Sequence, residues 1–148
     1  MHSRVVLTGF KRVNRSRRFI PLAFILAGLL MAGRAAAMDR FAALSLIESG
    51  DDDFARGRDT EVSRFQIRRE LWLLTTNAPI SQATNVVVAL AVAQTIAAKR
   101  GQDFAMRHGR PATDFEFYVL WNSPAQVDHP SRVVRERAGR FENLVQKK

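Results

Sequence analysis

The sequence predicts a mainly α-helical domain. Apolar residues recur three and four positions apart in several stretches, and these stretches begin at capping residues and end at glycine or proline. No alternating strand pattern of comparable strength is present. Residues 50–63, 101–112 and 123–130 are irregular, so we expect clefts and functional loops there.

An export signal is expected ahead of this domain. Residues 1–37 carry seven Lys and Arg and no acidic residue, and their apolar run over 19–33 is followed by Ala35-Ala36-Ala37. The run of about 15 apolar residues is shorter than the roughly 20 that cross a bilayer as a helix. We therefore predict cleavage after Ala37, export to the periplasm or medium, and a domain over residues 38–148 without a stable membrane span.

Removal of this signal changes the charge balance. The chain has 23 Lys and Arg and a net charge of +9, but residues 38–148 keep 16 basic against 14 acidic residues, a net of +2. A nucleic-acid partner is therefore not expected. The remaining 111 residues suffice for one domain with a single core. Because the chain has no cysteine, that core must hold the domain without disulfides.

The first predicted helix carries an unusual carboxylate. Asp39 can cap it, Phe41 and Leu44 lie on its apolar face, and Gly50 ends it. Glu48 follows Leu44 by four positions and therefore falls on the same face. Apolar surroundings disfavour the ionised form of a carboxyl group and raise its pKa, which suits a general acid near neutral pH. The alternative is a partly exposed carboxylate at a helix end, bound by nearby loop amides.

The remaining helices follow in order. A short helix is expected over 70–74, before an Asn-Ala-Pro stretch. The longest and most buried helix is expected over 81–100, with its end at Gly101. A capping box opens another helix over 113–121, and a last helix begins at a capping serine and spans 131–145.

Three motifs resemble the lysozyme-like superfamily, and most closely lytic transglycosylases and goose-type lysozymes. Residues 43–50, Ala-Leu-Ser-Leu-Ile-Glu-Ser-Gly, are similar to the end of the family's catalytic helix. Residues 63–67, Ser-Arg-Phe-Gln-Ile, are similar to its Gly-Leu-Met-Gln or Gly-Pro-Tyr-Gln-Ile element. Residues 118–124, Tyr-Val-Leu-Trp-Asn-Ser-Pro, look like its Tyr-Asn-x-Gly-Pro element. The resemblance implies a lysozyme-like helical domain with a short irregular or β-containing loop after the catalytic helix.

The resemblance also implies roles for individual residues. Glu48 would protonate the glycosidic oxygen. The substrate-binding residues would be Ser49, Phe65, Gln66, Tyr118, Trp121 and Asn122. The three aromatic residues have a second interpretation as core, and Gln66 as a capping amide. Ser63 and Arg64 depart from the family pattern and predict a bulkier or more charged cleft floor. The cross-cleft element also lacks the family's glycine.

The reaction depends on a second carboxylate. Glu61 is the preferred candidate, since it lies just before the Gln66 motif, whereas Asp51, Asp52 and Asp53 are expected to form a solvated turn. A hydrolase and a lytic transglycosylase, in which one glutamate acts as acid and then base, both remain open. The histidines lie in separate loops, so neither a catalytic metal nor another cofactor is expected.

The predicted substrate is peptidoglycan or a related amino-sugar polysaccharide such as chitin. A non-catalytic wall-binding or partner-binding module on the same fold is the main alternative, and a purely structural helical domain is a third. The sequence leaves the oligomeric state open.

Overall fold

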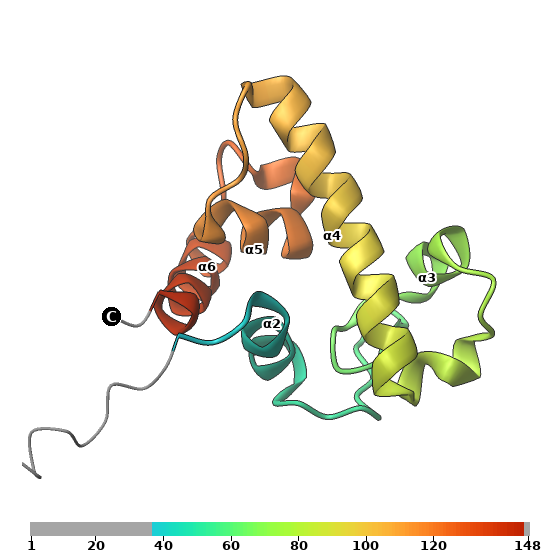
Figure 1. Ribbon diagram of the computed structural model, residues 1–148. Helices are drawn as coiled ribbons and strands as arrows, with labels where there is room; N and C mark the ends of the chain where they lie inside the picture. Colours follow the sequence, from blue (N-terminus) through green and yellow to red (C-terminus); the bar gives the residue numbers. More distant parts are fainter. Residues whose placement is uncertain (1–36, 147–148) are drawn as a thin grey trace, which may run out of the picture. The chain divides into compact units, whose positions relative to one another are not determined.

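A computed structural model describes residues 37–146, so the predicted export signal lies outside the described residues except for Ala37. These residues form a mainly helical fold with one two-stranded sheet, which confirms the predicted class (Figure 1). Its elements are α2 (Arg40–Ser49), β1 (Glu61–Val62), β2 (Ile67–Arg68), α3 (Arg69–Thr75), η1 (Ile80–Thr84), α4 (Val86–His108), α5 (Asp114–Asn122), η2 (Pro124–Gln126) and α6 (Arg132–Val145). Within this part of the chain, no helix has the length and apolar character needed to cross a membrane.

The predicted helix ends are confirmed where capping residues mark them. The Asp39 carboxylate caps α2 by accepting from the backbone N–H of Phe41 at 2.8 Å, and Gly50 ends α2 with a φ of 68°. Thr113 and Glu116 form the capping box of α5, and Ser131 caps α6.

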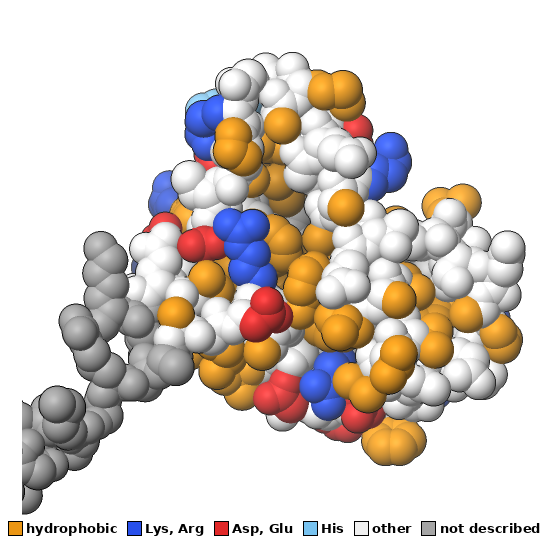
Figure 2. Space-filling model, in the orientation of Figure 1, with side chains coloured by type: hydrophobic (Ala, Val, Ile, Leu, Met, Phe, Trp, Pro, Cys, Tyr) orange, Lys and Arg blue, Asp and Glu red, His pale blue; other side chains and the backbone are white. Residues whose placement is uncertain are grey.

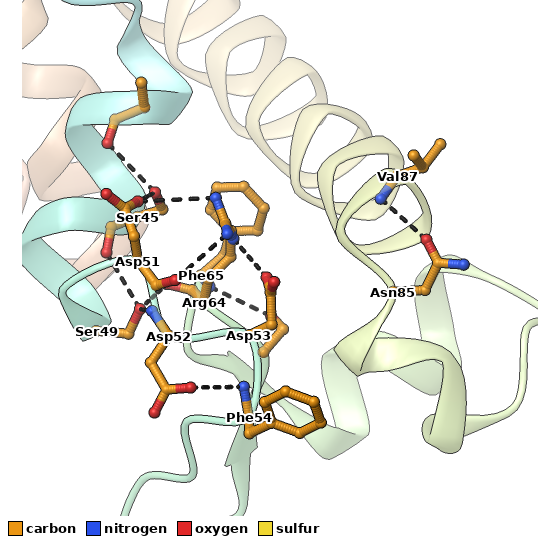
Figure 3. Close-up of polar contacts among 12 residues, drawn as sticks. Ser45, Ser49, Asp51, Asp52, Asp53, Phe54, Arg64, Phe65, Asn85 and Val87 are labelled. Carbon is orange, nitrogen blue, oxygen red and sulfur yellow. Dashed lines mark hydrogen bonds and ion pairs between the residues drawn. The ribbon is translucent and has the colours of Figure 1, made fainter.

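The predicted boundaries of the longest helix are wrong. Residues 80–84 form the separate helix η1, and α4 begins only after Asn85, whose side chain accepts from the backbone N–H of Val87 at 3.0 Å (Figure 3). Gly101 lies inside α4 instead of ending it, and Gly109 provides the left-handed terminus with a φ of 68°. Residues 101–108 are therefore helical.

The burial of Phe104 explains why α4 continues through Gly101. The ring of Phe104 is 1% exposed and stacks on His108 with 4.1 Å between the ring centroids. Burial of a phenylalanine ring contributes about 2 kcal/mol. A glycine inside a helix costs only about 1 kcal/mol relative to alanine.

A short hairpin follows α2 in the chain. Strands β1 and β2 pair antiparallel, with Glu61 opposite Arg68 and Val62 opposite Ile67. Ser63 has a φ of 68°, and its carbonyl accepts from the backbone N–H of Gln66 at 3.0 Å. This turn confines the chain between the strands and sets the direction in which the Gln66 side chain leaves it.

The core joins the helices around α5. Helix α5 contacts both α4 and α6, and α2 packs on α6 (Figure 1). The rings of Tyr118 and Phe141 lie 5.5 Å apart in this core. The backbone N–H of Met38 donates to the carbonyl of Leu144 at 3.1 Å and so ties the two ends of the domain together. Residues 38–148 thus contain a complete core within one compact unit and are expected to fold by themselves.

Candidate functional site

A cleft of about 780 Å³ lies where the end of α2, the hairpin, the end of α5 and one face of α6 meet. Five of the eight site residues predicted from the sequence line this cleft. They are Glu48, Glu61, Gln66, Trp121 and Asn122. The structure therefore brings residues from three separate motifs to one site.

Glu48 contributes a shielded carboxyl group to the cleft. Its Oε1 atom is buried and has no hydrogen-bond partner among residues 37–146. Burial raises the pKa of Glu48 above its ordinary value, and the negative charge of Glu61 adds to that rise. The side chains of Tyr118, Arg137 and Asn122 oppose the rise, although no hydrogen bond of normal geometry joins Tyr118 or Asn122 to Oε1. Burial prevails, so the pKa of Glu48 lies above that of an exposed glutamate.

Tyr118 supports this carboxyl group from the core. Its side chain is fully buried beside Phe141 and does not line the cleft. Its hydroxyl is the other buried side-chain atom without a hydrogen-bond partner in the described part of the chain. Burial and the charge of Glu48 both raise the pKa of Tyr118, so its hydroxyl stays protonated. The ring therefore contributes packing and a neutral hydroxyl near Glu48, rather than a face for sugar stacking.

Glu61 and Gln66 line the same cleft, and hydrogen bonds in and next to the hairpin hold their side chains. Glu61 Oε2 accepts from the backbone N–H of Asp59 at 2.8 Å, and Gln66 Nε2 donates to the carbonyl of Ser63 at 3.0 Å. Both side chains pass close to Gly57. A Cβ atom at Gly57 would clash with the Glu61 carboxylate and lie 2.7 Å from Gln66 Oε1. The absence of a side chain at Gly57 thus lets both groups face the cleft.

Trp121 forms a wall that is fixed from both sides. Its Nε1 donates to the carbonyl of Phe65 at 3.2 Å. Arg100 packs over its ring, with the guanidinium carbon 5.7 Å from the centroid, and Arg100 Nη1 donates to the carbonyls of Leu120 and Trp121 at 2.9 and 2.7 Å. Arg100 therefore satisfies two carbonyls at the end of α5 that have no partner within the helix.

Ser49 lies behind the cleft, where it joins α2 to the hairpin (Figure 3). Its hydroxyl donates to the carbonyl of Arg64 at 2.9 Å and accepts from the backbone N–H of Asp52 at 3.1 Å. Phe65 is 2% exposed and packs edge-on against Phe41, with 6.3 Å between centroids. Neither Ser49 nor Phe65 lines the cleft, so the structure places both in its support.

Ser63 and Arg64, which depart from the family pattern, do not line the cleft. They therefore do not make its floor bulkier or more charged, as the sequence predicted. The Arg64 guanidinium instead donates to the Asp53 carboxylate at 2.6 Å (Figure 3). Asp51 also accepts from the Ser45 hydroxyl. The acidic turn is therefore tied to Arg64 and α2 instead of being only solvated, as the sequence predicted.

A second, apolar cavity of about 500 Å³ lies between α2, α4 and α5. Hydrophobic side chains gather between α4 and α5 on the face drawn in Figure 2. Two arginines line it: Arg40, which is paired with Asp114 at 2.6 Å, and Arg100. Arg100 and Trp121 line both cavities, but no carboxylate lines this one. The carboxylates predicted to act in catalysis therefore lie only in the cleft with Glu48.

Four arginines also line the cleft and were not predicted from the sequence. They are Arg58, Arg68, Arg100 and Arg137. Arg100 carries a signal that identifies it, because it lies four positions from both Ile96 and Phe104 and so interrupts a buried stripe as Glu48 does. Arg58, Arg68 and Arg137 are exposed and reach the cleft from three separate segments, which no local pattern reveals.

Between residues 37 and 146, no cluster of three His, Asp or Glu side chains is arranged to hold a metal ion. Comparison of the chain with protein-family models, curated proteins and solved structures finds no match. Function is therefore inferred from the sequence motifs and from the geometry of the cleft.

Proposed function

We propose that this chain is an exported lysozyme-like enzyme that cleaves β-1,4 glycosidic bonds of peptidoglycan, with Glu48 as its general acid. The observation that carries the proposal is the shielded, unpartnered carboxyl oxygen of Glu48 at the wall of a cleft of about 780 Å³. The order of the motifs around Glu48, Gln66 and Asn122 supports the same activity by resemblance. The predicted signal over residues 1–37 delivers the enzyme to the compartment of its substrate.

The chemistry begins with proton transfer from Glu48 to the glycosidic oxygen. Burial raises the pKa of Glu48, so this carboxyl group holds its proton to a higher pH than an exposed glutamate does. The positive charge of Arg137 then favours the carboxylate that remains after transfer, because opposite charges attract. Burial therefore favours the protonated Glu48 before proton transfer, and Arg137 favours the ionised Glu48 after it.

Polar and aromatic groups near Glu48 suit an amino-sugar substrate. The amides of Gln66 and Asn122 can exchange hydrogen bonds with N-acetyl and hydroxyl groups, and both line the cleft. Trp121 offers one edge of its ring, since its Nε1 is bound to Phe65 and it is 9% exposed. Sugar recognition is therefore expected to depend more on hydrogen bonds than on stacking.

Glu61 is the candidate for a second catalytic carboxylate. It faces the same cleft as Glu48, and its charge raises the pKa of Glu48. In an inverting hydrolase Glu61 activates the water that attacks the sugar, whereas in a lytic transglycosylase Glu48 performs both steps itself. A Glu61→Gln variant is expected to lose turnover only in the first case.

The test is digestion of purified murein by residues 38–148, with mass spectrometry of the soluble products. We expect the parent to release muropeptides and Glu48→Gln to release almost none. Glu70→Gln is the matched control, because Glu70 is exposed on α3 and outside the cleft. Anhydro ends select a transglycosylase, and reducing ends select a hydrolase.

Equal release by the parent and Glu48→Gln would remove Glu48 from the mechanism. A non-catalytic wall-binding module would instead pellet with murein and release nothing. A structural domain without affinity for sugars would do neither.

A further inference from the structure

The cleft contains more positive than negative charge. Four guanidinium groups face two carboxylates there, which leaves a net of +2, or +3 when Glu48 is protonated. Residues 38–148 as a whole have an excess of only two positive charges. The net positive charge of the residues that line this cleft is thus as large as the net positive charge of residues 38–148.

The cleft arginines are not neutralised by protein carboxylates. In the described part of the chain, none of the four forms an ion pair. Arg100 donates to two backbone carbonyls, which keeps its charge in place but leaves that charge uncompensated. The side chains of Arg58 and Arg68 donate no hydrogen bond to a residue between 37 and 146, and Arg137 lies close to Tyr118 and Glu48, where its charge opposes the rise in both pKa values. All three guanidinium groups line the cleft, where they can bind a ligand.

Two of these groups act on each other. The charge of Arg68 adds to burial in lowering the pKa of Arg100, because like charges close together disfavour the second protonated group. An anion bound between them would relieve that repulsion. A neutral sugar would not.

We propose that the cleft selects glycans bearing carboxylate groups, and that Arg58, Arg68 and Arg137 bind those groups. The inference rests on the proposed function and narrows its substrate class. A neutral amino-sugar polymer such as chitin has the hydroxyl and N-acetyl groups that Gln66 and Asn122 suit, but it has no anion for the arginines. Planar guanidinium groups match carboxylates in both geometry and charge.

Calorimetric binding to three tetrasaccharides of equal length tests the proposal. The protein is residues 38–148 carrying Glu48→Gln, which prevents turnover. The ligands are chitotetraose, a murein tetrasaccharide whose alternate sugars carry lactyl carboxylates, and the methyl ester of the latter. The acidic form is expected to bind about tenfold more tightly than the ester or chitotetraose at low salt, since each ion pair adds about 2- to 5-fold. Added NaCl should reduce the difference.

Arginine variants identify the groups responsible. Arg58→Gln and Arg68→Gln are each expected to weaken binding of the acidic tetrasaccharide by about 2- to 5-fold and to leave chitotetraose binding unchanged. Arg140→Gln is the matched control, because Arg140 is exposed on α6 and lies outside the cleft. The comparison of acid with ester needs no arginine variant, so misfolding of a variant does not affect it.

Equal affinity for the acid, its ester and chitotetraose would overturn the inference. If murein is also cleaved in a Glu48-dependent manner, the proposed function survives that result. Absence of binding to all three ligands, together with absence of murein cleavage, would overturn both.

Discussion

Replacement of Arg100 by lysine is expected to lower the free energy of unfolding by about 2 kcal/mol and to loosen the end of α5 that carries Trp121 and Asn122. Arg100 donates to the carbonyls of Leu120 and Trp121 at 2.9 and 2.7 Å, and it packs over the Trp121 ring. A lysine keeps the charge but has no planar group to pack over the indole. Its single ammonium group also has a different reach and geometry.

The magnitude follows from these contacts. Loss of one charge-assisted hydrogen bond costs about 1.5–3 kcal/mol, and loss of guanidinium packing on the indole costs about 0.5–1 kcal/mol. The ammonium group can still donate to one of the two carbonyls, so we place the net change near 2 kcal/mol. In a domain of this size, that corresponds to a fall in Tm of about 8 °C.

Urea unfolding of residues 38–148, followed by tryptophan fluorescence and circular dichroism, measures the change. Arg140→Lys is the control, since Arg140 is exposed and lies outside the cleft. If Arg100→Lys were within about 0.5 kcal/mol of Arg140→Lys, the role of Arg100 at the end of α5 would be refuted.

Three further predictions concern the hairpin and a helix cap. Ser63→Gly should be about 1 kcal/mol more stable than Ser63→Ala in urea unfolding, because the φ of 68° at Ser63 favours glycine; the opposite order would contradict this reasoning. Gly57→Ala should reduce murein release at least tenfold with little change in Tm, because its Cβ displaces the flexible ends of Glu61 and Gln66; full activity would count against a role for both side chains. Glu116 has a pKa of about 2, mainly because it binds an arginine, so the stability it provides is present above its unfolded pKa and is lost as pH falls through about 2. Glu116→Gln should therefore cost about 1–2 kcal/mol at pH ~7, and much less near pH ~2, in urea unfolding.

The beginnings of α2, α5 and α6 were predictable because each depends on a few adjacent residues. Asp39, Thr113 and Ser131 accept hydrogen bonds from backbone groups within three positions, and such caps can be recognised without tertiary structure. The end of α4 was not predictable in this way. Gly101 has the sequence signal of a helix end, but the burial of Phe104 against residues from other parts of the chain overrides it.

Two kinds of sequence signal predicted parts of the site: a residue that conflicts with its local pattern, and the order of the motifs. Glu48 interrupts an apolar helix face, and its shielded position follows from that spacing. Motif order brought Gln66 and Asn122 into the prediction, and Glu61 entered it as the carboxylate just before the Gln66 motif; all three line the cleft. The same motifs also included Ser49 and Phe65, because a motif preserves the residues that support a site as well as those that face it.

The most direct test of the central claim is the pKa of Glu48, measured by NMR titration of carboxyl-labelled residues 38–148, with Glu48→Gln assigning the signal. We expect the pKa of Glu48 to lie above the ordinary 4.5, because burial disfavours the carboxylate. Since a general acid must be protonated, murein cleavage should decline as pH rises through that same value. A Glu48 that titrates at or below 4.5, or cleavage that continues unchanged far above its measured pKa, would contradict its role as the shielded acid of this cleft.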